Sequence, residues 1–255
     1  TELLRPRAIY ERSDSASRAL EGLAPSVGSL LGEAPAPFEI QEDGVRIVVD
    51  VVNGQKTGLF LDQYENRRRF CALLPPGGRV LDCCCYVGAW ALAAAARGAR
   101  AVVGIDSSAW AIEQAEANSR LNGWADRLRS IRADVPEILR DWTAEPNFER
   151  FDAVVLDPPP FAKSKKHVAA ARRAYVAVNS AAMRLLAAGG LLATFSCSQH
   201  IAATAFDEIV ALAAQQANRR CRILARLDQP PDHPAVPAMP ETTYLKGLIV
   251  EVEPL

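Results

Sequence analysis

Val80-Leu-Asp82-Cys-Cys-Cys85-Tyr-Val-Gly88 is the stretch that decides the fold. An apolar run typical of a buried strand ends at a carboxylate, and a turn with a single glycine then opens a helix rich in alanine and leucine. A glycine at such a turn lets the backbone approach a ligand closely. A dinucleotide fingerprint needs three glycines to seat a pyrophosphate, and only Gly88 is present. The stretch therefore favours a ligand without a pair of phosphates.

Strand and helix patterns alternate on both sides of this stretch, from about residue 63 onward. Such alternation predicts a parallel sheet covered on both faces. Two last strands have no helix between them, so we expect them to pair antiparallel at one edge of a seven-stranded α/β sheet of the Rossmann-like kind. The predicted strands are 79–84, 101–105, 128–131, 151–156, 191–195, 221–227 and 244–252, and the predicted helices are 89–97, 109–122, 135–142, 168–188 and 204–218.

The first part of the chain has a different pattern and predicts a small α+β domain. We therefore divide the sequence into residues 1–62 and residues 63–255. Turn signals at Glu42-Asp-Gly44 and at Asn53-Gly54 separate alternating runs that are typical of antiparallel strands. The predicted elements are a helix over 13–23, a Gly/Pro-rich loop over 24–37, and strands over 38–40, 45–50 and 58–61.

The composition is typical of a soluble globular protein, with 49% apolar and 23% charged residues in a chain of 255. No apolar run approaches the roughly 18 residues of a membrane helix, and no signal peptide is expected at the start. Six cysteines, three of them consecutive, fit neither a disulfide framework nor a zinc site. We therefore predict a cytoplasmic protein with reduced thiols, no metal and no membrane. A net charge of −1 speaks against a large nucleic-acid footprint.

Aspartates stand at the ends of four successive predicted parallel strands, at Asp82, Asp106, Asp134 and Asp157. The carboxyl ends of parallel strands meet at one edge of a sheet, where ligands bind. There Asp106 can accept both hydroxyls of a ribose, and Asp134 can accept from the exocyclic amine of an adenine. Each aspartate alone could equally cap the helix that follows it. The series of four, together with Gly88, predicts an S-adenosylmethionine site.

Asp157-Pro-Pro-Pro-Phe161 and Ser196-Cys197-Ser198 follow two neighbouring predicted strands. The same sheet edge thus receives a carboxylate, a rigid proline wall and a thiol. A thiol at such a place suits covalent catalysis on a flat, electron-poor ring such as a pyrimidine. A buried cysteine at a strand end is the alternative for Cys197. For Phe161, a place in the core is as compatible with the sequence as stacking on a base.

Motifs spread over nearly the whole chain resemble those of the bacterial 23S rRNA 5-methylcytosine methyltransferases of the RlmI type, which have the class I methyltransferase fold. The resemblance implies S-adenosylmethionine as the cofactor, with Gln63 and Arg67 holding its methionine part, and rRNA as the substrate of a homodimer. Family members usually begin with an RNA-binding PUA domain, and we expect none in this sequence. The matching motifs are Lys56-Thr-Gly58, Leu61-Asp-Gln63, Asp82 to Gly88, Asp157-Pro-Pro159, Phe195-Ser-Cys-Ser198, Asp232-His-Pro234 and Tyr244-Leu-Lys-Gly247.

A mechanism follows for the two predicted catalytic residues. The Cys197 thiolate adds to carbon 6 of cytosine, and Asp157 engages the N3 and amino edge of the ring. The sequence names no base for the proton at carbon 5. The residues expected to contact RNA are the ring wall Pro158, the aromatic Phe161 and the basic residues Lys163, Lys165, Lys166 and Arg172, although a basic cluster is also compatible with a solvated helix face.

Two alternatives remain at the level of the sequence. Asp-Pro-Pro-Phe-like motifs also serve amino or guanine methylation of RNA, which needs no thiol. The chain is also compatible with a non-catalytic protein that binds S-adenosylmethionine and assists rRNA assembly. Cys197 is the residue that separates these alternatives from cytosine methylation, because only the last requires a nucleophilic sulfur.

Overall fold

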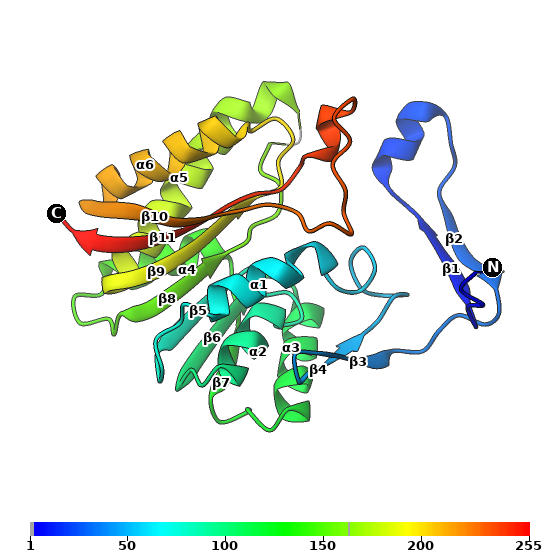
Figure 1. Ribbon diagram of the computed structural model, residues 1–255, viewed down its shortest axis with the longest axis horizontal. Helices are drawn as coiled ribbons and strands as arrows, with labels where there is room; N and C mark the ends of the chain where they lie inside the picture. Colours follow the sequence, from blue (N-terminus) through cyan, green and yellow to red (C-terminus); the bar gives the residue numbers. More distant parts are fainter. Residues whose placement is uncertain (1–2, 163) are drawn as a thin grey trace. The chain divides into compact units, whose positions relative to one another are not determined.

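The computed structural model describes residues 3–162 and 164–255. The chain divides into two compact units, Thr1–Leu61 and Asp62–Leu255 (Figure 1). The larger unit contains one seven-stranded sheet with the order β10-β11-β9-β8-β5-β6-β7. The strands are β5 (Arg79–Cys83), β6 (Ala101–Asp106), β7 (Leu128–Arg132), β8 (Phe151–Leu156), β9 (Leu186–Ser196), β10 (Arg219–Leu227) and β11 (Lys246–Pro254).

Five of these strands, from β9 across to β7, run parallel, and β11 lies between β9 and β10 and is antiparallel to both. The predicted seven-stranded α/β fold is therefore confirmed. The central strand β8 has an apolar run that is buried almost throughout, as expected for a parallel strand covered on both faces.

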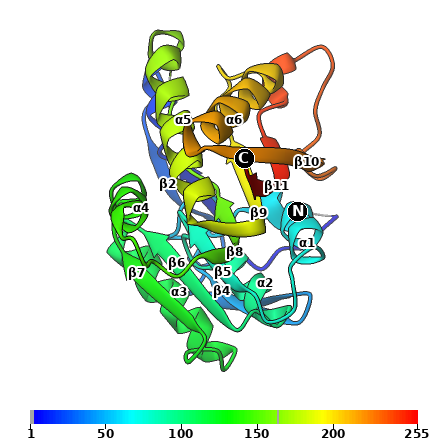
Figure 2. The same ribbon diagram turned by 90° about the vertical axis from the view of Figure 1, so that its left-hand side faces the viewer.

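Helices cover both faces of this sheet (Figures 1 and 2). Neighbouring helices pack in two groups, α1 with α2 and α3, and α4 with α5 and α6. None of the helices in the described residues is long and apolar enough to cross a lipid bilayer. The helices are α1 (Tyr64–Cys71), α2 (Ala89–Ala96), α3 (Ala109–Leu121), α4 (Val135–Ala144), α5 (Val168–Leu185) and α6 (Ala203–Ala217).

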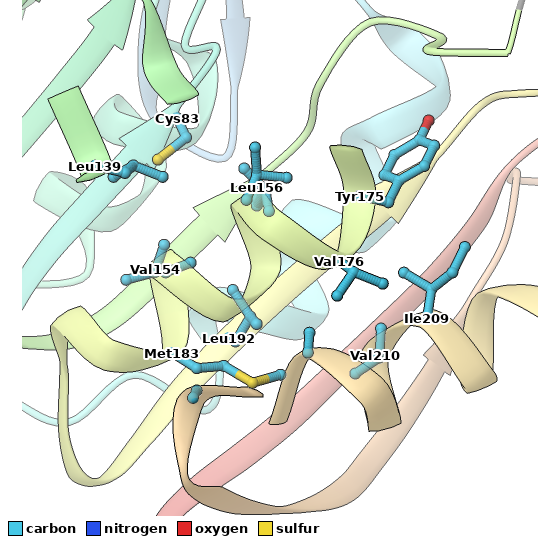
Figure 3. Close-up of a cluster of buried hydrophobic side chains, with 14 of the residues drawn as sticks. Cys83, Leu139, Val154, Leu156, Tyr175, Val176, Met183, Leu192, Ile209 and Val210 are labelled. Atoms are coloured by element: carbon cyan, nitrogen blue, oxygen red, sulfur yellow. The ribbon is translucent and has the colours of Figure 1, made fainter. Parts of the chain in front are cut away.

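The main hydrophobic core lies between α4, α5 and α6 and the sheet (Figure 3). Leu139, Val154, Tyr175, Met183 and Ile209 are completely buried there. Each large apolar side chain removed from water in this way stabilises the fold by about 1.5–3 kcal/mol. The core thus holds β8 and β9, which end at the two motifs singled out in the sequence, in a fixed frame.

The smaller unit consists of two antiparallel hairpins, β1 (Ile9–Ser13) with β2 (Ser26–Leu31) and β3 (Phe38–Glu42) with β4 (Val45–Val49). On β4, Val45, Ile47 and Val49 are buried, as the alternation of the sequence predicts.

Three predicted elements of this unit are wrong. The helix expected over 13–23 is a short 3-10 helix, Ala16–Glu21, and the loop expected over 24–37 contains β2. No strand forms over 58–61: the chain bends at Gly58, whose φ of 86° is a left-handed conformation outside the range of regular strands. The chain then enters a 3-10 helix, Leu61–Gln63.

Gly247 allows β11 to lie close against β9. In the antiparallel ladder it is paired with Phe195, whose ring covers the position where a side chain would stand. A Cβ atom built at Gly247 would lie 2.5 Å from Phe195 Cε1 and 2.9 Å from Leu227 Cβ. Non-bonded carbon atoms do not come this close to one another. The packing of β11 against β9 therefore requires a residue without a side chain at position 247.

We expect Gly247→Ala to lower the free energy of unfolding by about 2–3 kcal/mol, because the added methyl group overpacks the space taken by Phe195. Urea denaturation followed by circular dichroism measures the change. The matched control is Gly123→Ala, whose Cβ meets no atom within 4 Å and which has only the cost of a φ of 72°, about 1 kcal/mol. Equal losses for the two variants would contradict the packing described for Gly247.

Candidate active site

Four aspartates predicted in series gather around the turn that follows β5. Burial is the main effect that raises the pKa of the Cys84 thiol. Four carboxylate charges raise it further, those of Asp106, Asp157, Asp82 and Asp134. Cys84 therefore lies within electrostatic reach of all four carboxylates. The carboxyl edge of the sheet is strongly acidic at this point, which favours a ligand that carries positive charge.

Asp82 is completely buried at the end of β5. Its Oδ2 accepts a hydrogen bond of 3.0 Å from the backbone N–H of Ala91, while Oδ1 has no partner among the described residues. Burial raises the pKa of Asp82 to about 8, and the charges of Asp157 and Asp106 act in the same direction. A buried carboxylate oxygen without a partner is costly. The observation fits a site in which a cationic group of the cofactor completes the environment of Asp82.

The turn between β5 and α2 has an unusual backbone. Cys84 and Tyr86 have φ values of 62° and 50°, and Gly88 has a φ of 85°. The left-handed conformation costs about 1–2 kcal/mol at each residue that is not glycine. At Gly88 a side chain would also meet Ala115 of α3, at 3.3 Å between Cβ atoms. Gly88 thus permits both the turn and the close packing of α2 on α3.

Two of the aspartates bind backbone N–H groups. Asp106 accepts from Tyr86 at 3.0 Å and from Ser108 at 2.9 Å, one bond on each oxygen. Each carboxylate oxygen can accept a second bond, so Asp106 can still receive two hydroxyl groups. Asp134 is exposed and caps α4, accepting from the N–H of Glu137 at 3.1 Å. The capping role considered for the series is therefore present at Asp134.

Gln63 and Arg67, at the start of α1, are both almost completely buried beside these carboxylates. Gln63 donates through Nε2 to Asp157 Oδ2 at 3.0 Å, and its Oε1 accepts from Asn66 at 2.8 Å. The charge of Arg67 lowers the pKa of both Asp82 and Asp157, although other effects outweigh it. The structure thus brings Gln63 and Arg67 to the same acidic edge.

Asp157 accepts hydrogen bonds from the side chains of Trp90 and Gln63. Burial raises its pKa to about 6, and the charge of Asp62 adds to this effect, while Trp90, Gln63 and Arg67 oppose it. A carboxyl group with a pKa near neutrality can give or take a proton under physiological conditions.

Cys197 follows β9 and is only partly buried, so it is not a core cysteine. Its Sγ lies 4.0 Å from the carbonyl oxygen of Pro158, within the range of a weak S–H···O contact. The two motifs singled out in the sequence therefore meet. Pro158 itself is buried, and Pro159 and Pro160 are the exposed prolines. The RNA contact expected at Pro158 stays a prediction, and the exposed side chains of the motif are those of Pro159 and Pro160.

Phe161 takes the core position that the sequence left open. Its ring lies 4.6 Å from the Tyr175 ring, centroid to centroid, and the side chain is only partly exposed. The expected stacking of Phe161 on a nucleobase has to compete with this contact.

The basic residues expected to bind RNA have different surroundings. Lys163 lies outside the described residues. Lys165 and Lys166 belong to a 3-10 helix, Lys165–His167, on which Lys166 is exposed. Arg172 on α5 forms an ion pair of 2.8 Å with Glu208 on α6. Among the side chains of this set that the structure describes, Lys166 is exposed and accessible to a phosphate.

For three residues of the site, Trp90, Lys246 and Tyr244, the sequence predicts no role. Trp90 lies in the alanine-rich predicted helix 89–97, where an aromatic residue is compatible with the core. Lys246 and Tyr244 are in a recognised motif, but their partners, Ser198 and Asp62, lie 48 and 182 positions away in the chain. No local pattern connects residues at such distances.

Comparisons with known proteins identify the family of this chain. A family model described as S-adenosylmethionine-dependent methyltransferase matches residues 23–250. The ribosomal RNA large subunit methyltransferase I of Shewanella denitrificans is 46% identical over 247 residues, which are 96% of this chain and 62% of that protein. The protein of the same name from Aeromonas hydrophila is 45% identical over 246 residues, or 95% of this chain and 61% of that protein. The chain thus spans about three fifths of the length of these relatives.

Among solved structures, a Streptococcus mutans protein described as a SAM-dependent methyltransferase superposes with a TM-score of 0.76 at 24% identity. The match covers 88% of this chain and 58% of that one, and it supports the fold. The cofactor and the enzyme class predicted from the sequence are confirmed by the family match. The chain belongs to the family of S-adenosylmethionine-dependent methyltransferases.

Proposed function

We propose that this chain is the methyl-transferring part of a cytosolic enzyme that methylates carbon 5 of a cytosine in large-subunit rRNA, with Cys197 as the nucleophile. The observation that carries the proposal is the meeting of Cys197 with the Asp157-Pro158 motif, where Sγ lies 4.0 Å from the Pro158 oxygen. The names of the relatives at 46% and 45% identity support the substrate class. The need for a thiol distinguishes carbon 5 of cytosine from an amino group as the target.

Bound S-adenosylmethionine supplies a methyl group attached to a positively charged sulfur. The acidic edge of the sheet attracts such a ligand and orients it. Arg67 offers a guanidinium fork for a carboxylate, and the unpartnered Oδ1 of Asp82 suits an ammonium group. The residues proposed to hold the cofactor are Gln63, Arg67, Asp82, Gly88, Asp106, Asp134 and Asp157.

The proposed reaction depends on a thiolate because carbon 5 of cytosine is a poor nucleophile. The sulfur of Cys197 forms a bond to carbon 6, and the electron pair of the 5,6 double bond then makes carbon 5 nucleophilic. Asp157, with a pKa of about 6, is suited to donate a hydrogen bond at N3 while this charge develops. After methylation, loss of the carbon 5 proton to a base and cleavage of the sulfur–carbon 6 bond restore the ring and the thiolate.

The smaller unit offers a surface for the RNA chain. It contains a cavity of about 790 Å³ whose lining includes Arg7, Tyr10, Phe38 and Lys56. Arg12 forms part of the wall and donates to the carbonyl groups of residues 51, 52 and 54. Aromatic rings next to cationic side chains suit unpaired nucleotides, because bases stack on the rings and phosphates pair with the cations. RNA binding by this unit is therefore part of the proposal.

Cys197→Ser is expected to lower methylation of a large-subunit rRNA transcript at least about a thousandfold, because the nucleophile is lost. With RNA containing 5-fluorocytosine, the wild-type chain should accumulate a covalent adduct in the presence of S-adenosylmethionine, since fluorine cannot leave carbon 5 as a proton does. Denaturing electrophoresis detects the adduct. Calorimetry should give Cys197→Ser an affinity for S-adenosylmethionine within about twofold of the wild-type value.

Cys221→Ser is the matched control, because Cys221 is also partly buried but lies on β10. This variant should form the adduct normally. Normal methylation by Cys197→Ser would rule out the thiol mechanism and leave an amino group of a base as the target.

Asp82→Asn is expected to stabilise the cofactor-free protein while weakening cofactor binding about tenfold or more. A pKa of about 8 in the folded state, against about 3.9 in the unfolded state, means that folding favours the protonated form. The stability that Asp82 contributes is therefore present in full below about pH 4 and is lost as the pH rises toward 8. Asparagine does not ionise and so avoids this loss. The difference in free energy of unfolding between Asp82→Asn and wild type should therefore grow to a few kcal/mol by pH 8.5.

Thermal unfolding of the cofactor-free protein between pH 5 and pH 8.5 measures this difference. Asp126→Asn, a change at an exposed aspartate, is the control and should follow the wild type. A difference between Asp82→Asn and wild type that is the same at every pH would contradict the raised pKa of Asp82.

A further inference from the structure

A buried lysine lies next to the proposed nucleophile. Lys246 is the first residue of β11 and stands opposite Ser196 in the antiparallel ladder with β9. It is 9% exposed, and its Nζ donates hydrogen bonds of 2.7 Å to the carbonyl oxygens of Ser198 and Tyr244. Ser196 and Ser198 flank Cys197, so the ammonium group of Lys246 is bound to the turn that carries the thiol.

A buried ammonium group requires compensation for its lost hydration. The two carbonyl groups supply part of it, and no carboxylate in the described part of the chain influences the pKa of Lys246. Burial lowers the pKa of Lys246 to about 8, and the negative charge of Cys197 acts in the opposite direction. Among the described residues, Cys197 is the group whose negative charge raises the pKa of Lys246.

The turn also has a second anchor that does not involve the lysine. The Tyr175 hydroxyl group lies 3.1 Å from the Oγ atoms of both Ser196 and Ser198, and Ser198 Oγ accepts from the N–H of Ala162 at 3.2 Å. Figure 3 shows the Tyr175 ring beside the apolar cluster of α5 and α6, with the hydroxyl group turned away from it. The position of the turn is thus fixed from α5, which leaves the charge of Lys246 available for another role.

We infer that Lys246 is a positioning residue that holds Cys197 in its reactive thiolate form. Two of its three ammonium hydrogens bind the carbonyl oxygens of Ser198 and Tyr244, which holds the charge at the residue that follows Cys197. An adjacent cation stabilises a thiolate, and the thiolate is the nucleophilic form of cysteine. The inference deepens the proposed function, because it rests on Cys197 as the attacking group.

Two tyrosines also act on Cys197. Tyr175 comes from α5 and Tyr244 from the segment before β11, and both interact electrostatically with Cys197. Burial raises the pKa of each tyrosine, so both hydroxyl groups are neutral at physiological pH. Tyr244 donates to Asp62 at 2.7 Å and is occupied by that bond. Lys246 thus brings a positive charge to the thiol, whereas the two tyrosines are neutral.

The test is the rate of alkylation of Cys197 by iodoacetamide in the full cofactor-free chain between pH 5.5 and 9.5. Peptide mass spectrometry reports each cysteine separately. In Lys246→Met the rate at pH 7 should fall about tenfold, and the pH of half-maximal rate should rise by about one unit. Lys246→Arg keeps the charge and should stay within about threefold of wild type. Alkylation of Cys221 should not change in either variant.

A merely structural role for Lys246 predicts a different result. Lys246→Met would then change stability but leave the pH profile of Cys197 unchanged, and this outcome would overturn the inference. Lys246→Gln removes the charge while keeping a hydrogen-bond donor, so it supplies the same comparison if Lys246→Met does not fold. In methyl transfer, both neutral variants should lower kcat and leave the KM for S-adenosylmethionine within about twofold.

The proposed function and this inference can fail separately. A shifted alkylation profile in Lys246→Met together with full methylation by Cys197→Ser would leave the lysine–thiolate pair in place and reject the cytosine mechanism. Loss of methylation in Cys197→Ser with an unchanged alkylation profile in Lys246→Met would keep the mechanism and reject the role of Lys246.

Discussion

The parallel register of three strands is the constraint on which the site depends. Leu156 of β8 is paired with Cys83 of β5 on one side and with Thr194 of β9 on the other. The three strands therefore end at nearly the same level, and the residues that follow them leave the sheet together. A slip of one residue would turn every side chain of a strand to the opposite face. The meeting of Pro158 with Cys197, and of Asp157 with the end of β5, is thus a consequence of backbone pairing.

This constraint explains why much of the site can be predicted from the sequence. The strand 151–156 is predicted with its observed bounds, because a buried parallel strand is a short apolar run and the residue after it lies at the ligand-binding edge. Lys246 and Trp90 escape prediction, because their roles come from partners distant in sequence. In the smaller unit the prediction for 58–61 fails because the apolar pattern does not reveal the left-handed φ of Gly58.

The buried carboxylates at the edge of the sheet favour the binding of a cationic ligand, but they lower the stability of the protein without that ligand. The fold keeps Asp82 buried with one oxygen unpartnered, and it places Asp106 and Asp157 close enough to raise its pKa further. A protein selected for stability alone would have no reason to keep this arrangement, since a buried carboxylate is costly without a counter-charge. A cationic cofactor offsets that cost when it binds, so ligand binding and stability are linked.

The missing side chain at Gly247 has an effect that reaches across the sheet. The Phe195 ring fills the space over Gly247 and packs against Trp90, with 5.3 Å between ring centroids. Trp90 in turn donates a hydrogen bond to Asp157 and lowers the pKa of that carboxyl group. The absence of a side chain at Gly247 on β11 therefore influences the pKa of Asp157, through the rings of Phe195 and Trp90. Gly247, Phe195, Trp90 and Asp157 are thus mechanically coupled, and a substitution at one of them is expected to change the effect of a substitution at another.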